Sequence, residues 1–300
     1  MNKPVEKKMS FDAKNLTSTE HGDNSQSRLW WQNNPMTYDW DGALGQATFT
    51  PEYFHAIDAI FGVGHSLINN PRWPEGSILE RFVPYPELKG KSVLEVGCGM
   101  GLVASHIARA GARLTAIDMT PRAVFATRTR LEQAKLEGTV LEMDAEDMQF
   151  PNHSFDVVIT WGVIHHSGNM QKVLDEIWRV LKPGGHAYVM IYNRNSLRLQ
   201  VYCRFWLGVV CGRFFRQSFD QIVGSITDGY IARHLTAPEF KGMARRFSAV
   251  TISYSDEKTT ILKYLFGIGR PFKYLSGITR PLECWLARRW GWYLEARLTK

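Results

Sequence analysis

The sequence predicts an α/β fold in which a mostly parallel sheet is covered by helices on both faces. Between residues 91 and 193, short apolar runs alternate with helix-like segments five times, which is the pattern of a doubly wound sheet. The first apolar run leads directly into a glycine-rich turn that opens a helix. Folds of this class hold nucleotide-like ligands at that junction.

The first predicted strand, residues 91–96, is apolar at three of its last four positions, as expected for a strand buried on both faces. Glu95 interrupts the run. A carboxylate buried near the end of a strand needs a cation or a hydrogen-bond donor, so Glu95 is a candidate site residue. Gly97, Gly99 and Gly101 follow and let the backbone approach a ligand closely.

The glycine spacing is not that of a dinucleotide site. The fingerprint G-x-G-x-x-G would place its third glycine at position 102, where the chain has Leu102. The pattern is instead E-x-G-x-G-x-G, and a tight turn without a ligand is the alternative interpretation. A helix is predicted over 102–110, and Gly111 ends it.

Acidic residues end the next two predicted strands. The strand 113–118 ends at Asp118, about 20 residues beyond the glycine turn, where α/β nucleotide sites place a carboxylate on the ribose hydroxyls. Thr120-Pro121 predicts the start of a helix that runs toward Gly138. The strand 139–143 then leads into Asp144.

Two further strands are predicted in this half of the chain. The strand 155–160 is followed by a segment that contains His165 and His166. A helix over 171–181 has an apolar face, residues 182–185 end it, and the strand 186–192 follows.

Over about residues 90–193, six motifs occur in the order and spacing of class I methyltransferases, and the chain resembles the ubiquinone and menaquinone biosynthesis type (methyltransferase type 11). The motifs are Glu95–Gly101, Ile117-Asp118, Asp144–Glu146, Phe155-Asp156, His165-His166 and Leu181–Gly185. The resemblance implies a Rossmann-like, seven-stranded, mostly parallel sheet. We assign its last two strands to 248–254 and 292–298.

The resemblance implies S-adenosyl-L-methionine (SAM) as cofactor and S-adenosyl-L-homocysteine as product. Glu95 and the glycine turn would hold the methionine part, Asp118 the ribose, and Asp144 with Ala145 the adenine. The residues expected to bind the cofactor are Glu95, Gly97, Cys98, Gly99, Gly101, Asp118, Met119, Asp144, Ala145 and Trp161.

Methyl transfer from a sulfonium is an in-line displacement, so the protein must position the acceptor and remove its proton where needed. His166, His165 and Tyr192 are the candidate catalytic residues, and His166 matches the family position more closely. The alternative interpretation is that one of the histidines only hydrogen-bonds the start of a helix.

Acceptor choice must come from segments outside the cofactor motifs. Residues 29–40 are dense in aromatic and amide side chains, and we expect either a lid that stacks Trp31, Tyr38 or Trp40 near the cofactor or simple packing onto the domain. Tyr192 and Arg194 leave the end of the fifth strand and are expected to face the acceptor.

The chain divides by composition into five expected regions. They are a mobile leader (1–28), an N-terminal lid and helical segment (29–90), the SAM-binding core (91–193), a helical cap inserted after the fifth strand (194–247), and the last two strands with a basic, aromatic insertion at 257–290 (248–300).

Composition bounds the partners. The net charge is +7, and the basic excess lies in residues 194–300, which carry 18 Lys/Arg against 7 Asp/Glu. This charge fits an anionic substrate, an anionic membrane surface or nucleic acid, or else a solvated basic face. For 257–290 we expect peripheral membrane contact or, alternatively, core-facing aromatics. The four cysteines lack the spacing of metal ligands, so no metal is expected. We expect the protein to be cytoplasmic.

The sequence therefore predicts a SAM-dependent methyltransferase with a small-molecule or lipid-like acceptor. A nucleic-acid or protein methyltransferase that uses the basic third of the chain is one alternative. It is less favoured, because residues 160–163 read Thr-Trp-Gly-Val where amino-methylating enzymes resembling this class carry an N-P-P-Y-type tetrapeptide. A non-catalytic SAM-binding protein is the other.

Overall fold

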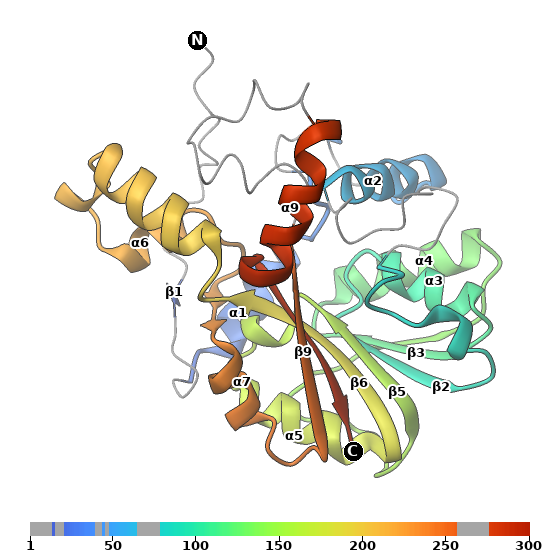
Figure 1. Ribbon diagram of the computed structural model, residues 1–300. Helices are drawn as coiled ribbons and strands as arrows, with labels where there is room; N and C mark the ends of the chain where they lie inside the picture. Colours follow the sequence, from blue (N-terminus) through green and yellow to red (C-terminus); the bar gives the residue numbers. More distant parts are fainter. Residues whose placement is uncertain (1–13, 16–20, 40–43, 46–47, 65–78, 257–275) are drawn as a thin grey trace.

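The computed structural model describes residues 14–15, 21–39, 44–45, 48–64, 79–256 and 276–300. These residues form a twisted central sheet with helices on both faces (Figure 1). The carboxyl-terminal part of the chain returns to the sheet and supplies two of its strands. The expected α/β class is confirmed.

Within the described residues, the main sheet has seven strands in the order β4-β3-β2-β5-β6-β10-β9, and a two-residue strand, β8, pairs with the end of β6. β10 is antiparallel to both of its neighbours, and the other pairings are parallel. The strands are β2 Ser92–Val96, β3 Arg113–Asp118, β4 Thr139–Glu142, β5 Phe155–Trp161, β6 Leu181–Asn193, β8 His234–Leu235, β9 Ala249–Ser255 and β10 Tyr293–Thr299. Separately, β1 (Lys14–Asn15) pairs with β7 (Ile231–Ala232).

The helices fall before, between and after these strands. They are α1 Asn24–Asn33, α2 Pro51–Gly64, η1 Tyr85–Glu87, α3 Leu102–Arg109, α4 Pro121–Gln133, η2 Ile164–His166, α5 Met170–Val180, η3 Arg198–Val210, η4 Arg213–Phe215, α6 Phe219–Gly224, α7 Ala237–Met243 and α9 Ser276–Trp290.

The parallel strands are apolar along most of their length because both faces of the sheet are covered. Consecutive residues of β2 enter different cores. Val93 belongs to a buried cluster with Ile107 of α3, whereas Leu94 belongs to a second cluster with Ile177 of α5. α3 and α4 therefore cover one face, and α5 covers the other with α7.

One expected boundary is wrong. Residues 182–185 were predicted to end the helix, with the strand beginning at His186, but β6 already begins at Leu181. Leu181 pairs with Phe155 and His186 pairs with Val157, so the residues between them bulge out of the ladder. β9 and β10 each begin one residue later than the assigned strands.

The segment after β6 returns to the sheet through several short elements. Its first helix, η3, is of π type: the Cys211 amide donates to the Trp206 carbonyl, five residues earlier, at 2.8 Å. A capping box opens α7, in which the side chains of Thr236 and Glu239 each accept from the other's backbone amide. α7 lies within residues 194–247, where the sequence predicts a helical cap.

α1 lies over the carboxyl ends of the strands. Asp23 caps it by accepting from the Ser25 amide at 2.9 Å, so the helix begins inside the segment 1–28 expected as a leader. An ion pair joins Arg28 to Glu142 at the end of β4, and Gln32 accepts from the Arg122 amide at 3.2 Å. None of the helices that the described residues form is long and apolar enough to cross a membrane.

α2 is joined to the core by a buried cation. The Arg130 side chain is 5% exposed, pairs with Asp58 of α2, and donates to the Met100 carbonyl at 3.3 Å. The other carboxylate oxygen of Asp58 is buried without a hydrogen-bond partner in this part of the structure. Removing Arg130 would leave a buried carboxylate uncompensated.

We predict that Arg130→Ala lowers the free energy of unfolding by about 3 kcal/mol or more, because breaking a buried ion pair strands its partner. Arg28→Ala, which breaks an ion pair whose arginine is 50% exposed, should cost less than about 1 kcal/mol. Urea denaturation of both variants measures the difference. Equal losses would contradict this view of how α2 is held.

Candidate active site

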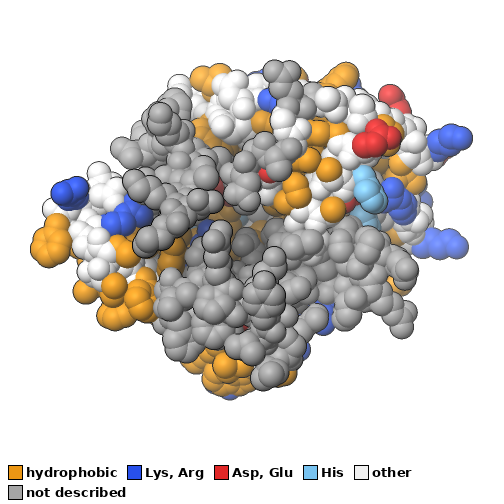
Figure 2. Space-filling model, turned by 90° about the horizontal axis from the view of Figure 1, so that it is seen from above, with side chains coloured by type: hydrophobic (Ala, Val, Ile, Leu, Met, Phe, Trp, Pro, Cys, Tyr) orange, Lys and Arg blue, Asp and Glu red, His pale blue; other side chains and the backbone are white. Residues whose placement is uncertain are grey.

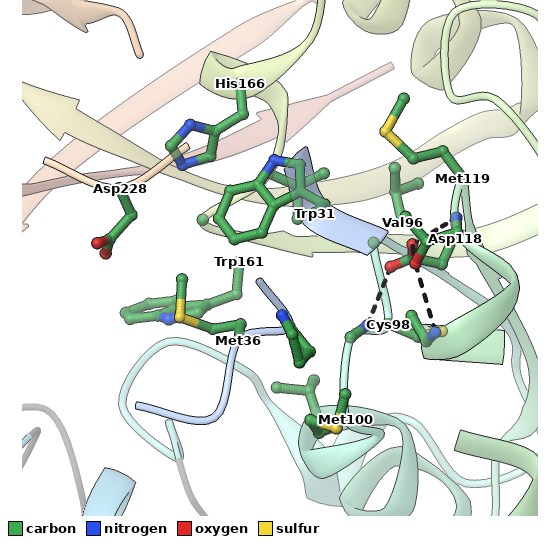
Figure 3. A pocket seen from close by; sticks show the side chains of 18 of the residues that line it. Trp31, Met36, Val96, Cys98, Met100, Asp118, Met119, Trp161, His166 and Asp228 are labelled. Atoms are coloured by element: carbon green, nitrogen blue, oxygen red, sulfur yellow. Dashed lines mark hydrogen bonds between the residues drawn. The ribbon is translucent and has the colours of Figure 1, made fainter. Parts of the chain in front are cut away.

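A cavity of about 690 Å³ opens at the carboxyl ends of β2, β3, β5 and β6. Ligands of open α/β sheets bind at this edge. α1 and the residues that follow it form a further wall, as do residues 225–228 and 292–293. Figure 3 shows part of the lining, with Trp31 beside His166 and Met36 beside Trp161.

The structure brings most of the sequence-predicted site residues together around this cavity. Those that line it are Glu95, Gly97, Cys98, Gly99, Asp118, Met119, Asp144, Ala145, Trp161, Trp31, Tyr38, His166 and Tyr192. Three others do not line it: Gly101, His165 and Arg194. Trp40 lies outside the described residues.

Glu95 occupies the most unfavourable position. Its side chain is 4% exposed, and one carboxylate oxygen is buried with no hydrogen-bond partner among the described residues. Burial, followed by the nearby Asp118 carboxylate, raises the pKa of Glu95 well above its usual range, although Arg130 opposes this shift. A cationic ligand in the cavity would relieve this cost.

The glycine turn is held by the end of β3. Asp118 accepts from the Gly99 amide at 3.1 Å and, through its other oxygen, from the Thr120 amide and hydroxyl at 2.9 Å each. Burial raises the pKa of Asp118, while these hydrogen bonds oppose the rise. A Cβ added at Gly99 would meet nothing within 4 Å, so the turn leaves room for a ligand.

Gly101 has a different role from the one expected. It takes φ +73 as the residue before α3, and a Cβ there would press against the backbone of Thr127 and the side chain of Arg130. Gly101 therefore shapes the turn and lets α4 pack closely, but it does not form part of the cavity wall.

Asp144 is already engaged by the N-terminal helix. Its carboxylate accepts from the Asn24 side-chain amide at 2.7 Å and from the Glu146 amide at 2.9 Å. Asn24 in turn accepts from the Gly168 amide at 3.2 Å. α1 thus closes the end of the cavity that the sequence assigned to adenine.

His166 lines the cavity, and a hydrogen bond determines which of its ring nitrogens carries the proton. Its Nδ1 lies 2.6 Å from the Ile231 carbonyl oxygen, which can only accept, so Nδ1 carries the proton and Nε2 does not. Nε2 is buried and has no hydrogen-bond partner within the described chain. Burial lowers the pKa of His166 to about 4, so the ring is neutral near pH 7.

His165 is not a site residue in this structure, which corrects the expectation. Its side chain is fully buried behind the wall, 4.2 Å from the Tyr192 ring by centroids, and its carbonyl accepts from the Arg233 amide at 3.0 Å. Burial lowers the pKa of His165 well below its usual range. Its role is packing behind Tyr192.

Arg194 is also directed elsewhere. It pairs with Glu239 of α7 at 2.7 Å and donates to the His234 carbonyl at 2.9 Å. Arg122 of α4 lines the cavity, and so does Arg198, which comes four residues after Arg194. The Arg198 guanidinium lies 4.6 Å from the centroid of the Trp292 ring.

Several residues of the cavity wall belong to no recognisable sequence motif. Arg198, Asp228 and Trp292 come from the segments after β6 and before β10, where composition predicts only a cap and a strand. Asn24 lay inside the expected leader. A possible signal was Asp228-Gly229, a pair typical of a sharp turn, whose glycine lets the backbone pass against His166.

The comparisons with known proteins agree with this geometry. Residues 94–189 match the protein family described as "Methyltransferase domain". This stretch therefore matches a methyltransferase domain, in agreement with the sequence motifs and with the strand order of the sheet.

Three curated relatives illustrate the likeness. A demethylmenaquinone methyltransferase of Tropheryma whipplei is 29% identical over 147 residues, which cover 47% of this chain and 61% of the relative. A phthiotriol/phenolphthiotriol dimycocerosates methyltransferase of Mycobacterium leprae is 38% identical, covering 40% and 45%. A ubiquinone biosynthesis O-methyltransferase of Coxiella burnetii is 32% identical, covering 36% and 46%. The match thus spans about half the length of these relatives.

We predict that His166 makes the free energy of unfolding fall on acidification. Below about pH 6.5 the unfolded chain takes up a proton at His166 that the folded chain refuses down to pH about 4, so the free energy of unfolding falls across this window. Between pH ~7.5 and ~5, the free energy of unfolding of His166→Gln, measured by urea denaturation, should fall by about 2 kcal/mol less than that of wild type. The exposed His21→Gln variant is the control, and parallel curves for wild type and His166→Gln would refute the assignment.

Proposed function

We propose that this chain, whose residues 94–189 form a class I SAM-dependent methyltransferase domain, transfers a methyl group from SAM to a small-molecule or lipid-like acceptor. One observation carries the proposal. The cavity at the carboxyl edge of the sheet contains a buried carboxylate, Glu95, with an unpartnered oxygen. The cofactor of this domain carries an ammonium group of the matching charge.

The residues present fit SAM at each of its parts. Glu95 would hold the amino group, and the open space beside Gly99 accommodates the methionine part. Asp118, at the end of β3, stands where a carboxylate would accept from the ribose hydroxyls. Asp144 and Ala145 line the remaining end, where adenine would exchange with or add to the Asn24 contact.

When bound, SAM supplies an electrophilic methyl group on a sulfonium. The chain then has to orient an acceptor in line with that group and exclude water from it. Trp31 and Trp161 both line the cavity (Figure 3). Both are positioned to enclose the reacting centre.

His166 would orient the acceptor through Nε2. Because Nδ1–H is fixed on the Ile231 carbonyl, Nε2 can accept a hydrogen bond from an acceptor hydroxyl. A ring whose pKa is about 4 is a weak base, so it suits an acceptor with an acidic proton, such as a phenol or an enol, better than an unactivated alcohol. Tyr192 lines the same wall, 5.8 Å from His166 by ring centroids.

Aromatic side chains line the part of the cavity where the acceptor would bind, and they favour a flat, apolar substrate. Trp161 packs edge-on against Phe82 at 5.2 Å between centroids and lies 5.5 Å from Tyr293. Tyr192 stacks on Trp292 at 4.5 Å. The relatives reported above are named as demethylmenaquinone, ubiquinone-biosynthesis and phthiotriol/phenolphthiotriol dimycocerosates methyltransferases. This aromatic wall would accept a quinone-like ring.

Peripheral contact with an anionic membrane belongs to the same proposal. Residues 257–275 of the basic, aromatic insertion lie outside the described residues. Its final part forms α9, where Leu282 and Trp285 are about half exposed and Arg289 lies over the Trp285 ring at 4.9 Å. Such a face would rest on a lipid surface.

We predict that SAM binding releases a proton. The raised pKa of Glu95 means that the ligand's ammonium must displace the proton of the carboxylic acid, so affinity should rise with pH through that pKa. Calorimetric titration in buffers of different ionisation enthalpy measures the released proton. Glu95→Gln should bind at least about tenfold more weakly and release none.

Asp118→Ala should also weaken SAM binding about tenfold or more, because a charge-assisted pair with the ribose is lost. Asp147→Asn, on the exposed loop beside Asp144, is the matched control and should bind as wild type does. No SAM binding by the folded wild type, or unchanged binding in Asp118→Ala, would contradict the proposal.

The acceptor class can be tested with methyl-labelled SAM. Incubation with separated lipid, small-metabolite, RNA and protein fractions of a cell extract should transfer label to the lipid or metabolite fraction. The extent should fall at least about tenfold in His166→Ala, because the oriented acceptor is lost. Label in RNA or protein would favour the other acceptor classes, and no label in any fraction would favour a non-catalytic SAM-binding protein.

A further inference from the structure

Beyond the cavity, the structure contains one projecting surface that the chemistry does not use. The helix η3 and the turn η4 extend away from the sheet together with α6, at the left of Figure 1. Five large apolar side chains at this end are 41–92% exposed. We call them the apolar tip, and they are Phe205, Val209, Val210, Phe214 and Phe215.

The apolar tip is held in a fixed shape. Gly212 takes φ +66 between η3 and η4, and its amide donates to the Val209 carbonyl at 3.1 Å. The Phe215 amide donates in turn to the Gly212 carbonyl at 3.2 Å. A Cβ at Gly208 would overlap the Phe214 ring, so this glycine allows the turn to pack back onto η3. Phe215, 92% exposed, is thus presented by an ordered turn.

The charge around the apolar tip is mostly positive. From Arg198 to Phe219 the chain has four arginines and no acidic residue, and the next residue, Asp220 of α6, is an exposed carboxylate. Arg204 lies over the Phe219 ring at 4.7 Å, and Arg213 is held by Gln217 at 2.5 Å and by Ser225 at 2.9 Å. Figure 2 shows basic and hydrophobic side chains side by side on this projecting end, at the left.

The same helix reaches the cavity. Arg198, the first residue of η3, lines the cavity, whereas Val210, the last, belongs to the apolar tip. A surface bound at the tip would therefore be connected to the acceptor half of the cavity by one helix of 13 residues.

We propose that the apolar tip inserts into the interface of an anionic phospholipid bilayer. Apolar side chains enter the headgroup boundary, and the flanking guanidinium groups bind lipid phosphates, the anions that match their geometry. The proposal that the tip binds a membrane is argued from the tip residues alone. The further idea that this binding delivers a lipid-like acceptor to the cavity rests on the proposed function. The tip, rather than α9, is the principal membrane contact.

Co-sedimentation of the full-length chain with phosphatidylcholine vesicles, with and without phosphatidylglycerol, tests the proposal. Wild type should bind the anionic vesicles, and added salt should weaken the binding. Phe215→Ser should bind about tenfold more weakly because one phenyl ring no longer leaves water. Arg216→Glu should weaken it by a similar factor. Phe125→Ser, at a phenylalanine that is 58% exposed on α4, is the matched control and should behave as wild type.

Three results would overturn the proposal. They are no binding of wild type to anionic vesicles at low salt, equal binding by Phe215→Ser and wild type, and loss of binding in Trp285→Ser with retention in Phe215→Ser. Sedimentation velocity adds a fourth: a wild-type dimer that Phe215→Ser converts to monomer would assign the tip to a second copy of the chain. SAM titration of Phe215→Ser, expected to match wild type, keeps this test separate from that of the proposed function.

Discussion

The burial of one carboxylate governs the rest of this site. Glu95 lies in β2, between two parallel strands, lines the cavity, is 4% exposed and has a buried oxygen without a partner among the described residues. A protein tolerates such a group only where a ligand or a buried cation offsets the cost. Arg130 lowers the pKa of Glu95 in part, and the same arginine joins α2 to the core. Arg130 therefore contributes both to the packing of α2 and to the electrostatic environment of Glu95.

The sheet order explains why the other groups converge on Glu95. β3 and β5 flank β2, so Asp118, the glycine turn and the residues after Trp161 all emerge at one edge. α1 then closes this edge through contacts with Asp144 and with the His166 carbonyl, to which Ser27 donates at 3.3 Å. The N-terminal helix thus depends on the same loops that would hold the cofactor, which couples its position to ligand binding.

Most of the cofactor half was predictable from sequence because its residues act at strand ends in a fixed order. Glu95, Asp118 and Asp144 each follow an apolar run, and the parallel sheet brings such positions together. The acceptor half was not predictable in this way. Arg198, Asp228 and Trp292 reach the cavity only through tertiary packing of the segment after β6. Arg194 was chosen because it follows the strand directly, but Glu239 of α7 pairs with it.

If Glu95 binds the ammonium group of the cofactor, the structure of the chain bound to S-adenosyl-L-homocysteine will show this contact most directly. We expect the amino group of the ligand within hydrogen-bond distance of the Glu95 carboxylate, about 3 Å. We expect the ribose hydroxyls to donate hydrogen bonds to the Asp118 carboxylate. A ligand bound elsewhere, or one whose amino group leaves the Glu95 oxygen without a partner, would contradict this role of Glu95.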